Sequence, residues 1–157
     1  MATSNQVLTA LRDELVAAGL VRKPATVGNL PPMHVEPRRG PLAPGEGEAP
    51  ETDGDLVVTI RLSSEVAGLP PLRRIYVVDF VYRSKASSGL LKGRALDEAI
   101  RQRLVDGSGY GVGIKLAAGQ GSQLWALQVS TFGGLGPVSD VEDVHTDVSK
   151  LAVETSS

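Results

Sequence analysis

The chain has 157 residues, of which 41% are hydrophobic and only 4% aromatic, and it contains no cysteine. Sixteen basic and eighteen acidic residues give a net charge of −2, which argues against a nucleic-acid-binding protein. The lack of cysteine excludes disulfides, thiolate nucleophiles and cysteine-ligated zinc. No signal peptide is visible, and no apolar run approaches the roughly 20 residues that span a bilayer. We therefore expect one domain over residues 1–157, made in the cytoplasm and not bound to a membrane.

The first predicted element is a helix over residues 4–18. Thr3 and Gln6 have the spacing of a capping box, in which each side chain bonds the backbone N–H of the other residue. Apolar side chains then recur at helical spacing, at Leu8, Leu11 and Leu15. Gly19 follows, as expected for a residue that ends a helix in the left-handed conformation.

Residues 24–54 contain seven of the ten prolines and five glycines, so no long regular structure is expected there. Residues 33–35 are compatible with a short edge strand. Residues 36–55 are predicted to be a long exposed loop that moves in the free protein, and a loop of this length inside a compact domain tends to be functional or disordered.

The loop over residues 36–55 has an unusual charge distribution. Two arginines lie at its base and its far half is acidic, with no basic residue among the acidic ones; these residues are Arg38, Arg39, Glu46, Glu48, Glu51 and Asp53. Its apolar content is too small to offset the roughly 1–2 kcal/mol per residue lost when a backbone is fixed. We expect a docking arm that orders against a neighbouring protein. A tolerated surface insertion is the alternative, because long loops cost little stability.

Residues 56–62 alternate as a strand, and residues 73–83 form a longer one whose two faces are both largely apolar, as in a central strand covered on both sides. The connection between them, residues 63–72, is too long for a tight hairpin. A second helix is predicted from Ser87 or Ser88 to about residue 105.

Further strands are predicted at about residues 110–117, 124–132 and 144–154, with a loop over residues 133–143. The alternation of the last strand slips near Ser149 and Lys150, which is consistent with a bulge. These elements predict an α+β fold with one mostly antiparallel sheet and two helices packed on it.

No arrangement of residues predicts catalysis, a cofactor or a metal. The glycine-rich run over residues 107–113 lacks the register of a phosphate-binding loop. No Gly-x-Ser-x-Gly motif occurs, and neither His34 nor His145 has a neighbour that marks it as a general base. The acidic stretch over residues 140–147 does not match the spacing of a calcium loop.

Charge is segregated along the chain. Residues 73–103 carry eight basic and three acidic side chains, residues 46–55 carry five acidic and no basic ones, and residues 138–157 carry five acidic and one basic. A chain of this kind can present complementary faces to copies of itself, and head-to-tail contacts close into rings when the rotation permits. Ordinary solvated faces are an equally open interpretation.

Within the basic segment, Asp79, Arg83 and Arg94 are candidate interface residues. Asp79 is the one carboxylate inside an apolar strand. The pattern leaves two interpretations open for it. Either it lies on an exposed side or near an edge of the sheet, or it forms a salt bridge between subunits.

The layout resembles the tail-terminator (tail-completion) proteins of long-tailed, siphovirus-type bacteriophages. The resemblance lies in the order of elements: an N-terminal helix over residues 7–15, a Pro/Gly loop, a strand over residues 77–84, a small-residue turn and an amphipathic helix over residues 95–104. It covers about residues 4–132 and includes no diagnostic motif. Residues 138–157 do not map onto it, and their role stays open.

That resemblance implies a non-enzymatic structural protein of the virion. Such proteins form a ring, typically a homohexamer, that caps the finished tail tube and offers a surface for head-to-tail joining. The expected partners are other copies of the chain, the tail tube protein and a head-completion or neck protein, at the head-proximal end of the tail. Another neck, connector or tail-tube-associated phage protein is one alternative. A small enzyme or ligand-binding module with an unrecognised site is the other.

Overall fold

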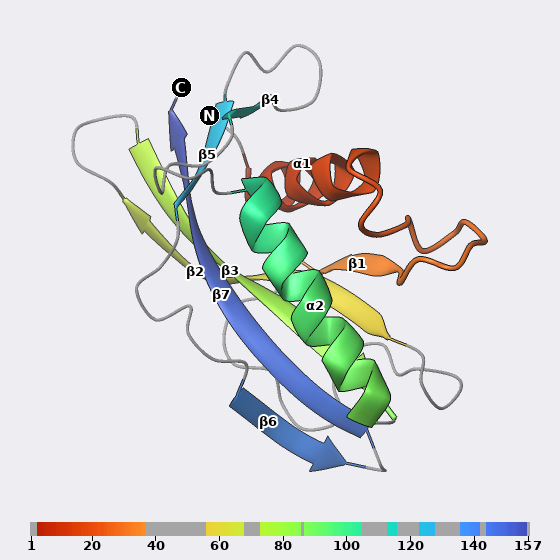
Figure 1. Ribbon diagram of the computed structural model, residues 1–157. Helices are drawn as coiled ribbons and strands as arrows, with labels where there is room; N and C mark the ends of the chain where they lie inside the picture. Colours follow the sequence, from red (N-terminus) through yellow and green to blue (C-terminus); the bar gives the residue numbers. More distant parts are fainter. Residues whose placement is uncertain are drawn as a thin grey trace.

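The computed structural model describes residues 3–36, 56–67, 73–85, 87–104, 113–115, 123–127, 136–141 and 144–156. Within these ranges the chain forms, in order, α1 (Ser4–Ala17), β1 (Met33–Glu36), β2 (Val57–Ala67), β3 (Arg73–Ser84), α2 (Ser87–Leu104), β4 (Gly113–Lys115), β5 (Gln123–Leu127), β6 (Gly136–Val141) and β7 (Val144–Ser156). Figure 1 shows the helices and strands along the chain.

Over the described ranges, seven strands form one sheet in the order β1-β2-β3-β7-β5-β4. β6 pairs with the first half of β7, whereas β5 pairs with its second half. β1 runs parallel to β2, whereas every other pair is antiparallel. The predicted α+β fold, with a mostly antiparallel sheet and two helices, is confirmed. β7 is the last element in sequence and lies in the middle of the sheet.

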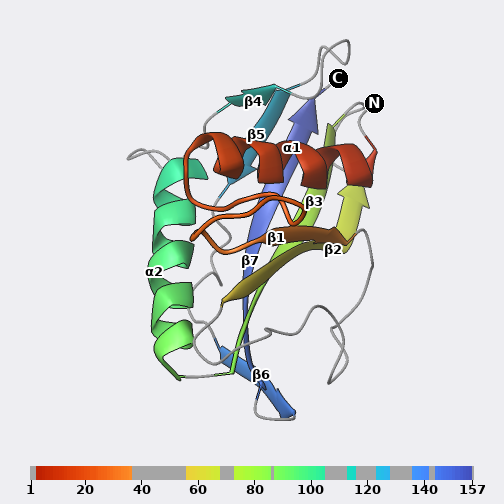
Figure 2. The same cartoon turned by 90° about the vertical axis from the view of Figure 1, so that its right-hand side faces the viewer.

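The two helices of the described chain share one hydrophobic core with the sheet, and Figures 1 and 2 show them on the same side of it. α1 begins at the predicted capping box, in which Thr3 Oγ1 accepts from the Gln6 N–H at 3.2 Å and the Thr3 N–H donates to Gln6 Oε1 at 2.9 Å. Gly19 follows the helix with a φ of 76°, as expected for a left-handed residue. The fully buried core side chains include Leu8, Leu11, Leu15, Ile60, Val78, Phe80, Ile100 and Val153.

α2 packs close to β3 because Gly93 faces the sheet. A Cβ atom at this position would lie 3.4 Å from Tyr82 Cβ and 3.5 Å from Leu56 Cδ1. Glycine is a poor helix former in isolation, so its presence inside α2 is explained by this close approach. None of the helices that the structure describes combines the length and the apolar character needed to cross a membrane.

The strands differ from prediction in two main regions. β2 continues through residues 63–67, which were expected to belong to the connection, and the sheet accommodates it with a register shift between Leu62 and Ser64. β6 lies in residues 133–143, which were predicted to be a loop, and pairs with the first half of β7. Of the predicted strands over residues 110–117 and 124–132, the described portions are β4 and β5.

β7 contains no bulge where the alternation slips. Its pairing with β3 runs without a break from His145 to Ser156. The pattern slips because a polar residue, Ser149, occupies a buried position that faces the helices, where it donates a hydrogen bond to Asp97 of α2. The expected long loop falls on residues 37–55, outside the described residues, whereas Glu36 ends β1.

Candidate functional site

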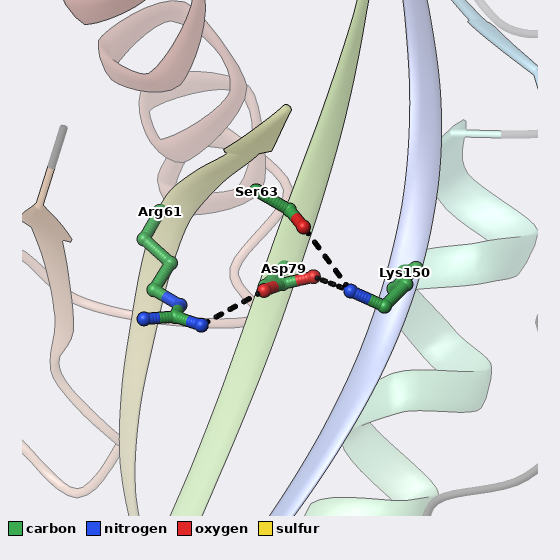
Figure 3. A network of polar contacts seen from close by, with 4 residues as sticks. All are labelled: Arg61, Ser63, Asp79 and Lys150. Carbon is green, nitrogen blue, oxygen red and sulfur yellow. Dashed lines mark hydrogen bonds and ion pairs between the residues drawn. The ribbon is translucent and has the colours of Figure 1, made fainter. Parts of the chain in front are cut away.

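A row of alternating charges crosses four neighbouring strands on the face of the sheet opposite the helices. The Cα pairing places Glu36 of β1 beside Arg61 of β2, Arg61 beside Asp79 of β3, and Asp79 beside Lys150 of β7. We call these four residues the charge row. Figure 3 shows three of them, with Ser63.

Asp79 is the centre of the charge row. Its Oδ2 lies 3.2 Å from Arg61 Nη2, and its Oδ1 accepts a hydrogen bond from Lys150 Nζ at 2.8 Å, so both carboxylate oxygens have partners within the chain (Figure 3). Lys150 Nζ also donates to Ser63 Oγ at 3.2 Å. The side chains of Arg61 and Asp79 are each 2% exposed, whereas that of Lys150 is 47% exposed. Because its two oxygens bond residues of the two neighbouring strands, Asp79 links β2, β3 and β7.

This placement corrects one interpretation of Asp79. The residue is neither exposed nor near an edge, because it is buried on β3, between β2 and β7. A carboxylate is stable there because a buried charge that is paired and hydrogen-bonded avoids most of its desolvation penalty. Two cations from two different strands supply that pairing.

A second polar network joins α2 to the sheet. Asp97 of α2 is 4% exposed, and its Oδ1 accepts hydrogen bonds from Tyr82 Oη at 2.7 Å and from Ser149 Oγ at 2.6 Å. Its Oδ2 lies 3.5 Å from Arg101 Nη2, one helical turn away. Burial, with a smaller effect of the Asp97 carboxylate, raises the pKa of Tyr82 well above its ordinary value of 10.0. Tyr82 therefore stays neutral and donates a hydrogen bond to Asp97.

Of the other predicted interface residues, one is buried in the sheet, one is exposed on α2 and six lie outside the described residues. Arg83 is 3% exposed, and its Nε donates to Thr146 Oγ1 at 3.4 Å, so it belongs to the sheet interior. Arg94 is exposed on α2. The remaining six candidates lie outside the described residues and are Arg38, Arg39, Glu46, Glu48, Glu51 and Asp53.

The two histidines do not meet. His34 lies in β1 and His145 in β7, with β2 and β3 between these strands. Within the described residues, no group of three or more histidine or acidic side chains is placed to hold a metal ion.

The outer face of α2 is basic. Lys92 and Arg94 are exposed there, together with a single acidic residue of the helix, Glu98. Asp97 is buried against the sheet, so the charge that α2 presents to solvent is more positive than its sequence alone indicates.

An exposed loop connects α1 to β1, in the Pro/Gly-rich stretch where no long regular structure was expected. Residues 23–30 are all exposed, and Arg22 lies at the base of this segment. Its Nε donates to the Leu30 carbonyl at 2.8 Å and its Nη1 to the Thr26 carbonyl at 2.5 Å. We call residues 23–31 the Arg22 loop. The density of prolines nearby signals a loop, but nothing in the sequence shows that an arginine organises it.

In comparisons with known proteins, no protein-family model and no curated protein matches this chain.

Proposed function

We propose that this chain is a structural virion protein, a tail terminator that forms a ring, caps the tail tube of a long-tailed bacteriophage and provides the surface for head-to-tail joining. The order of elements supports the proposal. An N-terminal helix precedes the sheet, and a central strand leads directly into an amphipathic helix that packs back on it. This order agrees with the layout on which the family resemblance rests.

The use of the buried carboxylates supports a structural role. Asp79 bonds to β2 and β7, and Asp97 bonds to β3 and β7. Catalytic acids and bases are usually found in clefts, with a lone pair or proton available to a substrate. Asp79 and Asp97 instead accept hydrogen bonds from neighbouring strands of the same chain, and these bonds hold the strands and α2 in place.

The basic outer face of α2 is the observation that carries the proposal. Two of the three acidic residues in the basic segment, Asp79 and Asp97, are buried within the chain, whereas Lys92 and Arg94 are exposed on α2 together with one acidic residue, Glu98. The chain also carries the acidic segment over residues 46–55, with five acidic and no basic residues. A positive surface on one copy and a negative segment on the next allow head-to-tail contacts, and a closed set of such contacts is a ring.

Native mass spectrometry of the full chain tests self-association. We expect a closed ring at low salt that loosens as salt rises, because exposed charges are screened over roughly 8 Å at physiological ionic strength. Replacing Lys92 and Arg94 together by Glu should weaken the ring. Glu98→Lys is the matched control on the same face, and it should leave the ring intact because it adds positive charge.

A wild-type chain that stays monomeric at every salt concentration would contradict the proposal. The capping and joining role is tested separately by replacing residues 40–53 with a short Gly/Ser linker. If residues 36–55 dock, the variant should fold but fail to support infectious particles. Normal particle yield would assign that segment to a tolerated insertion.

A further inference from the structure

Part of the sheet is buried on the face opposite the helices. The side chains that alternate with the core along β2 and β3 are there at most 7% exposed, and they are Val57, Thr59, Arg61, Asp79, Val81 and Arg83. Val57 and Val81 are buried without belonging to the core that the helices share with the sheet. Both described helices lie on the other side (Figures 1 and 2). A further part of the same chain therefore covers this face.

The burial is confined to one end of the face. Further along the same strands, Ser63 and Val77 are only partly buried, and the side chain of Lys150 on β7 is 47% exposed. The chain leaves the sheet after Glu36, at the end of β1, and returns to it at the start of β2. Residues 37–55, the longest stretch between two described ranges, thus begin and end beside the buried part.

The connection between β1 and β2 is a crossover. The two strands are parallel neighbours, and crossovers between parallel strands are right-handed in about 98% of cases. The chain also passes from β3 to the parallel strand β5 by way of α2, on the helix side of the sheet. Both connections step in the same direction across the sheet, but β1 and β2 run opposite to β3. Two such crossovers of one hand lie on opposite faces, so a right-handed connection from β1 to β2 passes over the face away from the helices.

Two polar atoms of the buried face need partners. Arg61 Nε and Thr59 Oγ1 are buried and have no hydrogen-bond partner among the described residues. A buried donor without an acceptor costs about 1–3 kcal/mol, so a cover that supplies oxygen atoms is favoured over an apolar one. Residues 46–55 supply them, because this segment carries five acidic and no basic side chains.

We propose that residues 37–55 pack over this face of their own sheet and that carboxylates of residues 46–55 accept hydrogen bonds from Arg61 and Thr59. The small apolar content of the segment is then less of an obstacle, because the face offers it polar contacts. The contact lies within one chain and does not depend on the proposed ring. A segment with five carboxylates can use one or two on its own sheet and present the others to a neighbouring copy.

The absence of cysteine from the chain allows a test by thiol labelling. Val81→Cys places a thiol on the covered face and Val78→Cys places one on the helix side of the same strand, at positions that are at most 1% exposed. Each variant is labelled with a maleimide in the full chain and in a chain whose residues 40–53 are replaced by a short Gly/Ser linker. We expect the linker to speed labelling of Val81→Cys at least about tenfold and to leave Val78→Cys slow. Equal protection of Val81→Cys in both chains would overturn the proposal.

A second variant carries the test if the linker chain does not fold. It keeps the full length and replaces four acidic residues by their amides, at Glu46, Glu48, Glu51 and Asp53. Labelling of Val81→Cys should again become faster relative to Val78→Cys, and an unchanged ratio would overturn the contact.

The protein concentration separates this cover from a partner. Protection of Val81→Cys should be the same at every concentration, because the cover belongs to the same chain. Protection that appears only as the concentration rises would assign the cover to a second copy and overturn the proposal. A monomer with a protected Val81→Cys would keep the contact while contradicting the ring, so the two proposals fail separately.

Discussion

The guanidinium of Arg61 and the carboxylate of Asp79 lie 3.2 Å apart on neighbouring strands, and each side chain is 2% exposed. Lys150 pairs with the same carboxylate from the opposite strand, but it is 47% exposed. Arg61 is therefore in an environment of lower dielectric constant than Lys150. Losing the Arg61 ion pair should lower the free energy of unfolding more than losing the Lys150 ion pair.

We predict that Asp79→Ala lowers the free energy of unfolding by about 3–5 kcal/mol, because it removes the buried ion-pair partner of Arg61. Lys150→Gln should change it by less than about 1 kcal/mol, because the Arg61 pair remains and the lost ion pair is half-exposed. Urea denaturation measures both values. Similar losses for the two variants would contradict the assignment of Arg61 as the essential partner.

The Tyr82 hydroxyl gives a prediction for alkaline pH. Its pKa is raised in the folded state, so above about pH 10 an unfolded tyrosine loses its proton while the buried one keeps it. Tyr82 thus contributes stability that is complete below pH 10 and declines as the pH rises further. Tyr82→Phe should be less stable by about 1.5–3 kcal/mol at pH 7, through the lost bond to Asp97, and this deficit should shrink above pH 10. A deficit independent of pH between 8 and 11 would contradict the prediction.

Gly93 is predicted to tolerate one added carbon but not a large side chain. Gly93→Ala places a Cβ in contact with Tyr82 and Leu56 without overlap, and the gain in helix propensity of up to about 1 kcal/mol offsets any tightness. Gly93→Leu should lose about 1–3 kcal/mol from overpacking against the sheet. Lys92→Leu, the same side chain at the exposed neighbouring position, is the control and should have little effect on the thermal midpoint.

Arg22→Ala should loosen the Arg22 loop without unfolding the protein. The substitution removes two hydrogen bonds to loop carbonyls, so we expect hydrogen exchange at the Thr26 amide to accelerate about tenfold. Arg12→Ala is the matched control, because Arg12 lies on α1 and bonds only its neighbour Asp13 among the contacts described. Unchanged exchange at Thr26 would show that the Arg22 side chain does not order the loop.

Replacing His34 and His145 together by Ala tests the non-enzymatic proposal. The two residues lie on separated strands, so we expect the double variant to fold and assemble normally. A circular dichroism spectrum checks folding, and native mass spectrometry checks assembly. A folded variant that no longer supports function would point to an unrecognised histidine-dependent site.

The sequence predicts correctly those elements that form because of nearby residues. The capping box, the helical spacing of α1 and the apolar run of β3 predict these elements to within a residue or two. β6 was missed because Gly136 and Pro137 begin it, and both residues are typical of loops. It forms because β7 offers it a strand to pair with, which is a tertiary effect.

The charge row could not be predicted because it depends on register. Glu36, Arg61, Asp79 and Lys150 are separated by up to 114 positions in sequence, and only the pairing of four strands aligns them. Asp79 alone was noticed, since a carboxylate interrupts an apolar run there. Arg61 fitted the ordinary alternation of its strand, and Lys150 lay where the alternation of the last predicted strand slips.

The position of β7 has a consequence for how the chain folds. β7 follows every other described element in sequence, yet β3, β5 and β6 all pair with it, and its partners in β3 lie between 61 and 83 positions earlier, from Ser84↔His145 to Arg73↔Ser156. Contacts this distant slow folding, and during synthesis β3 remains an open sheet edge until residue 156 has emerged. Such edges pair with other chains unless a charge interrupts them. Asp79 lies midway along that edge, so the carboxylate that later joins three strands first disfavours aggregation of the unfinished sheet.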